Sequence, residues 1–274
     1  TGILYLFRGL AYLVLGDNAR AFQDYGTFAT LDPPADYARV IRNLPEAELD
    51  EVDRIFLKYS ADGHLNSKYA VALFRMGSLN IDQGDAKVAV KILTNAIKAD
   101  SQLPLTFFAR GCAHLNLANN EQGLNDFEKA IQLDPDYRHA YSARAQAHDR
   151  LGDFESAIHD WSELTRLDPE TAEPHLFLGN SYQSLEKYEE AIANYDRAID
   201  LNPKIDTAFN NRAIAHASLG NHQKAVEDFD ETLRMSPDIT LAYVSRGQSL
   251  SMLGAHELAI DSFDQAIKLE PKFH

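Results

Sequence analysis

The chain has 274 residues, of which 45% are hydrophobic and 24% charged, the proportions of an ordinary soluble protein. Asp and Glu outnumber Lys and Arg by 41 to 26, and the resulting net charge of −15 disfavours nucleic acid and anionic membrane surfaces as partners. The single cysteine, Cys112, cannot form an internal disulfide or a cysteine-rich zinc site. This fits a reducing compartment, among which the cytoplasm is favoured.

The first predicted unit covers residues 1–35. Its apolar stretch from Ile3 to Leu15 is interrupted by Arg8 and is well short of the roughly 20 residues that a membrane-spanning helix requires. We therefore predict no membrane span. Because Thr1 already lies inside this unit, we expect the sequence to be a fragment of a longer protein.

Residues 36–69 are predicted to form a divergent helical unit. Asn43 and Ile55 stand where the other units carry small residues, and Pro45 interrupts the expected first helix. Apolar residues at helical spacing still predict a helix in the second half of the segment. Two interpretations stay open: a decayed unit that stacks in register, which its preserved length favours, or an inserted helix that packs elsewhere.

Six consecutive units with a period of 34 residues occupy residues 70–273. Each carries, in order, a glycine or alanine, a small residue, and then as a rule an aromatic residue four positions later and a proline. That spacing of four places the small residue and the aromatic on one helix face. The aromatics are Phe127, Trp161, Tyr195, Phe229 and Phe263, and the prolines are Pro135, Pro169, Pro203, Pro237 and Pro271.

This pattern resembles the tetratricopeptide repeat (TPR) family, whose repeat consists of two antiparallel helices. The resemblance implies an all-α fold, a right-handed superhelical solenoid of antiparallel helix pairs that runs as one continuous array. It implies a scaffold or adaptor that binds a peptide or protein segment in its concave groove. The alternatives are a substrate-recruiting arm of a larger enzyme and a self-assembling structural scaffold.

An arginine and an aspartate sixteen positions later occur together in four units. Where Leu178 replaces the arginine, Asn194 replaces the aspartate, so in these units the two charges are either both present or both absent. We interpret them as structural ion pairs within each unit rather than as a row of anion-binding arginines. The expected pairs are Arg8 with Asp24, Arg110 with Asp126, Arg144 with Asp160, and Arg212 with Asp228. Arg246 faces Ser262 instead, and we expect it to turn to Asp228 of the preceding unit.

In this family the first helix of each unit lines the concave surface, and here the expected lining changes along the chain. The N-terminal part is apolar: Ile3, Leu6, Phe7, Leu10, Leu13, Val71, Phe74, Leu105, Phe108 and Cys112. The later part is polar: His139, Ser142, Gln146, Asn180, Gln183, Asn210, Asn211, Ser245 and Gln248. Because amides both donate and accept hydrogen bonds, the polar row is predicted to bind the backbone of an extended peptide.

Each zone also has a simpler interpretation. The polar row is equally compatible with ordinary solvated residues on a helix face. The apolar zone is equally compatible with a surface covered by residues 36–69 or by residues that precede Thr1.

Some family members bind the C-terminal carboxylate of chaperones through a clamp of two Asn and three basic residues. Asn180 and Asn211 match the two Asn positions, but Leu176, Leu241 and Ser245 replace the basic residues. Without cations that bind carboxylate oxygens, we predict no recognition of chaperone tails at this site.

Nothing in the sequence indicates catalysis. His114, His148 and His216 share one repeat position and are interpreted as packing residues rather than metal ligands. Neither a Gly-rich phosphate loop nor a known nucleophile or zinc motif occurs. We therefore predict no enzyme activity, no metal and no cofactor.

The sequence stops just after Pro271, the proline of a full repeat. Solenoids usually finish with a solvating helix. We expect either a truncated capping helix or self-association through the uncapped C-terminal repeat.

Overall fold

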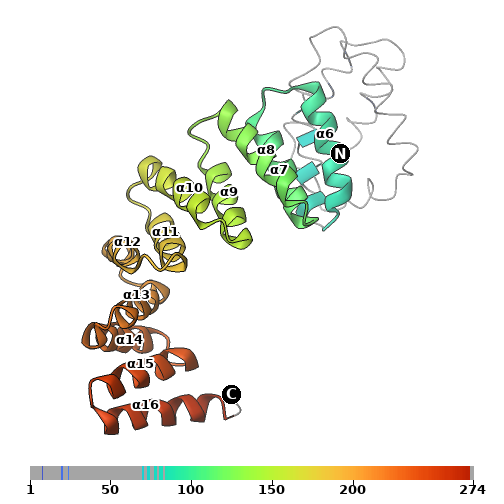
Figure 1. Ribbon diagram of the computed structural model, residues 1–274. Helices are drawn as coiled ribbons and strands as arrows, with labels where there is room; N and C mark the ends of the chain where they lie inside the picture. The colour runs from blue at the N-terminus through green and yellow to red at the C-terminus, as the bar shows by residue number, and fades with distance from the viewer. Residues whose placement is uncertain are drawn as a thin grey trace. The chain divides into compact units, whose positions relative to one another are not determined.

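The computed structural model describes residues 84–271 and, before them, positions 8, 20, 24, 70, 73, 74, 77, 78 and 80–82. In this part of the chain eleven complete helices, α6 to α16, follow one another, and none of it forms a strand (Figure 1). The fold is an all-α helical repeat, as the sequence predicts. The predictions for residues 36–69, and most of those for residues 1–35, lie outside the described residues.

The helices alternate between a first and a second helix of each repeat. The first helices are α7 (Pro104–Asn116), α9 (Arg138–Leu151), α11 (Ala172–Ser184), α13 (Asp206–Ser218) and α15 (Thr240–Met252). The second helices are α6 (Ala86–Ala99), α8 (Asn120–Leu133), α10 (Phe154–Leu167), α12 (Tyr188–Leu201), α14 (His222–Met235) and α16 (His256–Leu269). Each series begins again every 34 residues, so the sequence period is also the period of the helices.

The chain forms two compact units, residues 1–143 and 144–274, each described here by itself. In the first unit α7 packs against both α6 and α8. In the second unit successive helices from α10 to α16 pack against one another. The first helices of neighbouring repeats also touch there, α11 with α13 and α13 with α15. Every second helix between them is therefore covered on both sides.

Five of the six second helices, all but α6, end two residues before the proline of the repeat. The residue before a proline is disfavoured in the helical region of backbone conformation, so the helix stops there. The six residues that follow these helices have φ between −132° and −146°, in extended or near-extended backbone. They are Asp134, Asp168, Asn202, Ser236 and Glu270, each before a proline, and Asp100, which no proline follows. Asp100 shows that the conformation belongs to the repeat and does not need the proline.

The core of most repeats is one aromatic side chain packed against small residues, and in the repeat of α6 Leu93 takes the place of the aromatic. Trp161, Tyr195, Phe127 and Phe229 are among the largest side chains that are fully buried. A methyl group added to Gly179 would lie 2.6 Å from Cε1 of Tyr195. The small residue in the first helix therefore makes room for the aromatic of the second helix, as close packing requires.

The turn between the two helices of a repeat uses a left-handed residue. Gly220 has φ of +76°, and Gly84, Gly152 and Gly254 are similar. Ala118 and Glu186 adopt the same conformation with φ of +58°. These two turns therefore keep the shape of the others although they lack the glycine that relieves the steric cost of this region.

We expect Glu186→Gly to raise the free energy of unfolding by about 0.5–1 kcal/mol, because relief of the left-handed strain exceeds the added freedom of the unfolded chain. Urea denaturation followed by circular dichroism measures this change. Gly220→Ala is the matched control, with an expected loss of about 1 kcal/mol from conformation alone. An added methyl at Gly220 meets no atom within 4 Å. A destabilised Glu186→Gly variant would contradict the prediction.

Candidate functional site

The arginines of the first helices bind the aspartates sixteen residues later. Arg110 Nε and Nη2 donate to Asp126 Oδ2 and Oδ1 at 2.8 and 2.7 Å. The equivalent two-bond geometry joins Arg8 to Asp24, Arg144 to Asp160, and Arg212 to Asp228, with each separation between 2.6 and 2.8 Å. All four aspartates are buried. A buried carboxylate needs such a charge-assisted fork to offset its lost hydration.

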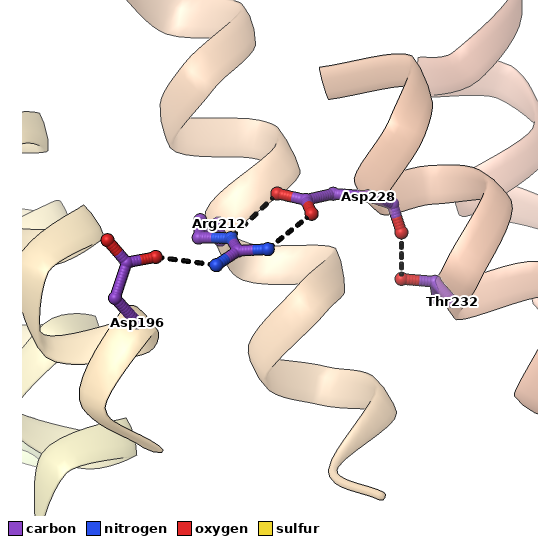
Figure 2. A network of polar contacts seen from close by, with 4 residues as sticks. All are labelled: Asp196, Arg212, Asp228 and Thr232. Atoms are coloured by element: carbon purple, nitrogen blue, oxygen red, sulfur yellow. Dashed lines mark hydrogen bonds and ion pairs between the residues drawn. The ribbon is translucent and has the colours of Figure 1, made fainter. Parts of the chain in front are cut away.

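Two of these arginines, Arg212 and Arg110, also bind side chains of the preceding repeat, Asp196 and Thr94, contacts that the sequence analysis did not predict. Figure 2 shows Arg212 between two carboxylates, with Asp228 of its own repeat on one side and Asp196 on the other. Arg212 Nη1 lies 2.5 Å from Asp196 Oδ1. Thr232 Oγ1 donates to the backbone carbonyl of Asp228 at 2.9 Å (Figure 2). Arg212 therefore links two successive repeats.

The expected partner of Arg246 was wrong. Its Nε donates to Asp230, 2.5 Å away, and not to Asp228, while Nη1 donates to Ser262 Oγ at 2.6 Å. Asp228 is occupied by the fork of Arg212. Asp230 lies sixteen residues before Arg246, the position that Asp196 holds relative to Arg212. A carboxylate at this earlier spacing was the sequence signal that would have found both contacts.

Four amides of the predicted polar row form one hydrogen-bonded cluster with Tyr195. Asn180 Oδ1 accepts from Asn211 Nδ2 at 2.8 Å and from the Tyr195 hydroxyl at 2.9 Å. Asn210 Nδ2 donates to Asn211 Oδ1 at 3.1 Å, and Gln183 Oε1 lies 3.1 Å from the Tyr195 hydroxyl. Burial raises the pKa of Tyr195, so the hydroxyl stays protonated and acts as a donor. The amides thus orient one another and leave the N–H groups of Asn180 and Gln183 without a partner in the described part of the chain.

A second polar cluster lies one repeat earlier. Asp149 Oδ2 accepts from the Trp161 indole at 2.8 Å, and Asp149 Oδ1 accepts from Ser181 Oγ at 2.7 Å. The Trp161 ring stacks on Phe177, with centroids 4.8 Å apart. Asp149, on α9, therefore joins α10 and α11 through two neutral donors.

The two clusters share a spacing in the sequence that the sequence analysis did not identify. The residue twelve positions before each core aromatic accepts a hydrogen bond when the aromatic has a polar tip, as Asp149 does for Trp161 and Gln183 for Tyr195. Where the aromatic is phenylalanine, that earlier residue is Leu115, Ala217 or Ser251. The covariation was visible in the sequence once the aromatics were compared for polar atoms.

Two open pockets lie on the first helices of the second unit. The α9–α11 pocket has a volume of about 500 Å³ and is lined by Gln146, Asp149, Arg150, Phe154, Glu173, Phe177, Asn180 and Ser184. The α13–α15 pocket, of about 320 Å³, is lined by Ile214, Ala217, Ser218, His222, Phe229, Ser245, Gln248, Ser249 and Met252. The two occupy equivalent places two repeats apart. Only Gln146, Asn180, Ser245 and Gln248 among their lining residues belong to the predicted polar row.

The remaining predicted lining residues of the described part belong to the first unit. Phe108 packs edge-on against Tyr137 at 5.3 Å and against His139 at 6.3 Å, both measured between ring centroids. Cys112 is half-buried, and desolvation raises the pKa of its thiol to about 11. The others are Phe74, which packs on a buried cluster around Leu93, Leu105, which is exposed, and Ser142, which is half-buried.

The histidines predicted to be packing residues do not converge. No group of three metal-binding side chains occurs among residues that the structure describes. Nδ1 of His114 and of His216 is buried and makes no hydrogen bond within that part of the chain. Burial lowers the pKa of His216, with nearby Lys224 and Arg212 adding to the shift and Asp228 opposing it. The neutral imidazole is therefore the form that packs in the native state.

We expect His216→Leu to change the dependence of stability on pH. Because the pKa of His216 is lowered in the native state, the unfolded chain takes up the proton first as the pH falls below about 6.5, and stability declines. Leucine, which stands at the equivalent position 250, cannot titrate. The difference in unfolding free energy between wild type and variant, measured by urea denaturation at several pH values, should shift in favour of the variant at acidic pH. A constant difference would contradict the prediction.

The repeated helix pairs, the shared aromatic core and the polar first-helix surface define a helical repeat protein of the scaffold class. A sequence model described as "Tetratricopeptide repeat" matches residues 108–170, 142–204, 176–238 and 213–272, which together cover well over half of the chain. The chain belongs to the tetratricopeptide repeat family, whose members are typically non-catalytic interaction scaffolds. A second model, "Anaphase-promoting complex subunit 5", matches only residues 42–102.

Solved structures agree on the fold. A crystal structure of MamA protein is 23% identical, with a TM-score of 0.59 over 62% of this chain and 92% of that chain. YrrB, described as "a TPR protein with an unusual peptide-binding site", is 20% identical, with a TM-score of 0.59 over 66% and 93%. A tetratricopeptide repeat protein from Parabacteroides merdae ATCC 43184 is 17% identical, with a TM-score of 0.54 over 98% and 93%. A comparison with curated protein sequences found no match. None of the described helices is long and apolar enough for a membrane crossing.

Proposed function

We propose that the chain is an adaptor that binds an extended polypeptide segment along the first helices α9, α11, α13 and α15. The observation that carries the proposal is the amide cluster of Asn180, Asn211, Asn210 and Gln183, flanked by an open pocket on each side. Amides that are fixed by one another present oriented donors to the backbone carbonyls of a peptide at little entropic cost.

The comparison with YrrB supports peptide binding by this fold, since that protein is described as having an unusual peptide-binding site. The proposed binding of a peptide backbone differs from the recognition of a C-terminal carboxylate by the chaperone-binding relatives. Leu241 is 62% exposed and Ser245 lines the α13–α15 pocket, so neither offers a cation to a C-terminal carboxylate. The polar pair Asn180 and Asn211 is therefore assigned to the peptide backbone.

Affinity capture with the full chain tests the proposal. A double variant, Asn180→Ala with Asn211→Ala, is expected to lose a partner that wild type retains, because both orienting amides are gone. Gln265→Ala, an exposed amide on the second helix α16, is the matched control and should retain the partner. Circular dichroism must show equal helix content in all three. Retention of every partner by the double variant would contradict a site at this cluster.

A second candidate function, self-association, is favoured by the exposed face of α16. Ile260 is 57% exposed, whereas Val226, at the equivalent position of α14, is 7% exposed because α15 covers it. Ile267 is also 60% exposed. An apolar stacking face of this kind tends to be covered by a protein partner, here a second copy. Light scattering at several concentrations should show a dimer that Ile260→Lys dissociates, and a monomer at every concentration would exclude it.

A further inference from the structure

The α9–α11 pocket differs from its equivalent in charge. Three of its lining residues are ionisable: the carboxylates of Asp149 and Glu173 and the guanidinium of Arg150. The lining of the α13–α15 pocket includes no Asp, Glu, Lys or Arg. Two pockets built on the same helical framework therefore offer different chemistry to a bound segment.

The negative charge of Asp149 is held in place but not neutralised. Its two oxygens accept from the Trp161 indole and from Ser181 Oγ, both neutral donors. Asp149 and Glu173 take part in none of the ion pairs found among the described residues. A carboxylate that accepts only from neutral donors is not offset by a neighbouring cation, so it can still attract an incoming one.

Aromatic rings complete the pocket. Phe154, at the start of α10, and Phe177, on α11, both line it, and Phe177 stacks on the buried Trp161 ring. Aromatic surface packs against the methylene stem of a long basic side chain and attracts its cation through the ring face. Carboxylates beside aromatic rings are thus suited to lysine or arginine and not to an acidic side chain.

We propose that the α9–α11 pocket receives a lysine or arginine side chain of the segment bound along the first helices. This inference rests on the proposed function and adds the chemical class of one ligand position. The net charge of −15 favours a basic partner over an acidic one. Arg150 is an exposed lining residue of the pocket, and its charge opposes the cation, so its removal is expected to strengthen binding.

The test begins with selection of random-sequence peptides, displayed on phage, against the immobilised full chain. The selected peptides are expected to share a lysine or arginine at one position. A synthetic selected peptide and its copy with leucine at that position are then titrated against the chain. Trp161 is the only tryptophan of the chain and contacts two lining residues, Asp149 and Phe177, so its fluorescence is expected to change when the pocket is occupied.

Matched variants separate charge from fold. Glu173→Gln is expected to weaken the basic peptide about fivefold and Arg150→Gln to strengthen it by a similar factor, while neither affects the leucine copy. Glu189→Gln is the charge-matched control, because Glu189 is an exposed carboxylate on the second helix α12, outside the proposed binding surface. It should leave the affinity for the basic peptide unchanged.

The outcomes distinguish the two proposals. Peptides that bind without a shared basic residue, or that bind Glu173→Gln as tightly as wild type, would overturn the basic-side-chain pocket and leave the adaptor function standing. A library from which no peptide binds the chain would overturn both. A basic peptide whose binding is weakened by Glu173→Gln, strengthened by Arg150→Gln and unchanged by Glu189→Gln supports the inference.

Discussion

Asp228→Asn is expected to lower the free energy of unfolding by about 2–3 kcal/mol, because it leaves the Arg212 guanidinium facing an amide in a partly buried site. The side chain of Asp228 is 9% exposed and that of Arg212 20%. Asp196→Asn removes the other carboxylate on Arg212, but that side chain is 53% exposed, so a loss below about 1 kcal/mol is expected. Denaturation by urea, followed by circular dichroism, measures both.

The chain itself supplies the compensating change. One repeat earlier, Leu178 and Asn194 occupy the positions of Arg212 and Asp228. A double variant, Arg212→Leu with Asp228→Asn, copies that natural combination and should recover most of the loss, giving a favourable coupling of more than about 1 kcal/mol. Strictly additive losses would show that the two side chains do not act as a pair.

Asp149→Leu is expected to lower the free energy of unfolding by about 2–3 kcal/mol. The substitution removes the hydrogen-bond acceptor of the buried Trp161 indole and one of the two acceptors of the Ser181 hydroxyl. This loss of stability should depend on the two donors, Trp161 and Ser181. In a background of Trp161→Phe and Ser181→Ala, where no donor is left unsatisfied, the same substitution should cost less than about 1 kcal/mol.

This background is also copied from the chain, where Leu115, Phe127 and Ala147 occupy the three equivalent positions. Urea denaturation of the four variants completes the comparison. Equal losses from Asp149→Leu in both backgrounds would contradict the role of the carboxylate as an acceptor. The near-ultraviolet circular dichroism of Trp161 gives an independent check on the packing of the ring.

Much of the fold could be predicted because the residues that pack together within a repeat are close in sequence. The prolines predicted where second helices end, and the 34-residue period predicted where α7, α9, α11, α13 and α15 begin. The covariation of Arg212 with Asp228 predicted contacts between residues sixteen apart in one helix pair. The neighbours involved are close in sequence, so a regular pattern carries the information.

The candidate site was only partly predictable, because it depends on contacts between repeats. Asn180 and Asn211 were expected on one surface, but their bond to each other and to Tyr195 required the helices to be placed. Asp149 was overlooked because its partners lie on two other helices.

The sequence by itself determined the helix pairs, their period and their aromatic cores, since these follow from local spacing and from which residues can end a helix or fill a gap. Only the tertiary structure decided which polar groups are satisfied and which carboxylates keep their charge. Asp196 is paired with Arg212 of the next repeat, whereas Asp149 accepts from two neutral donors, lines an open pocket and takes part in none of the described ion pairs. The physical reason is that charge pairing depends on distances between side chains of different helices, and stacking alone fixes those distances.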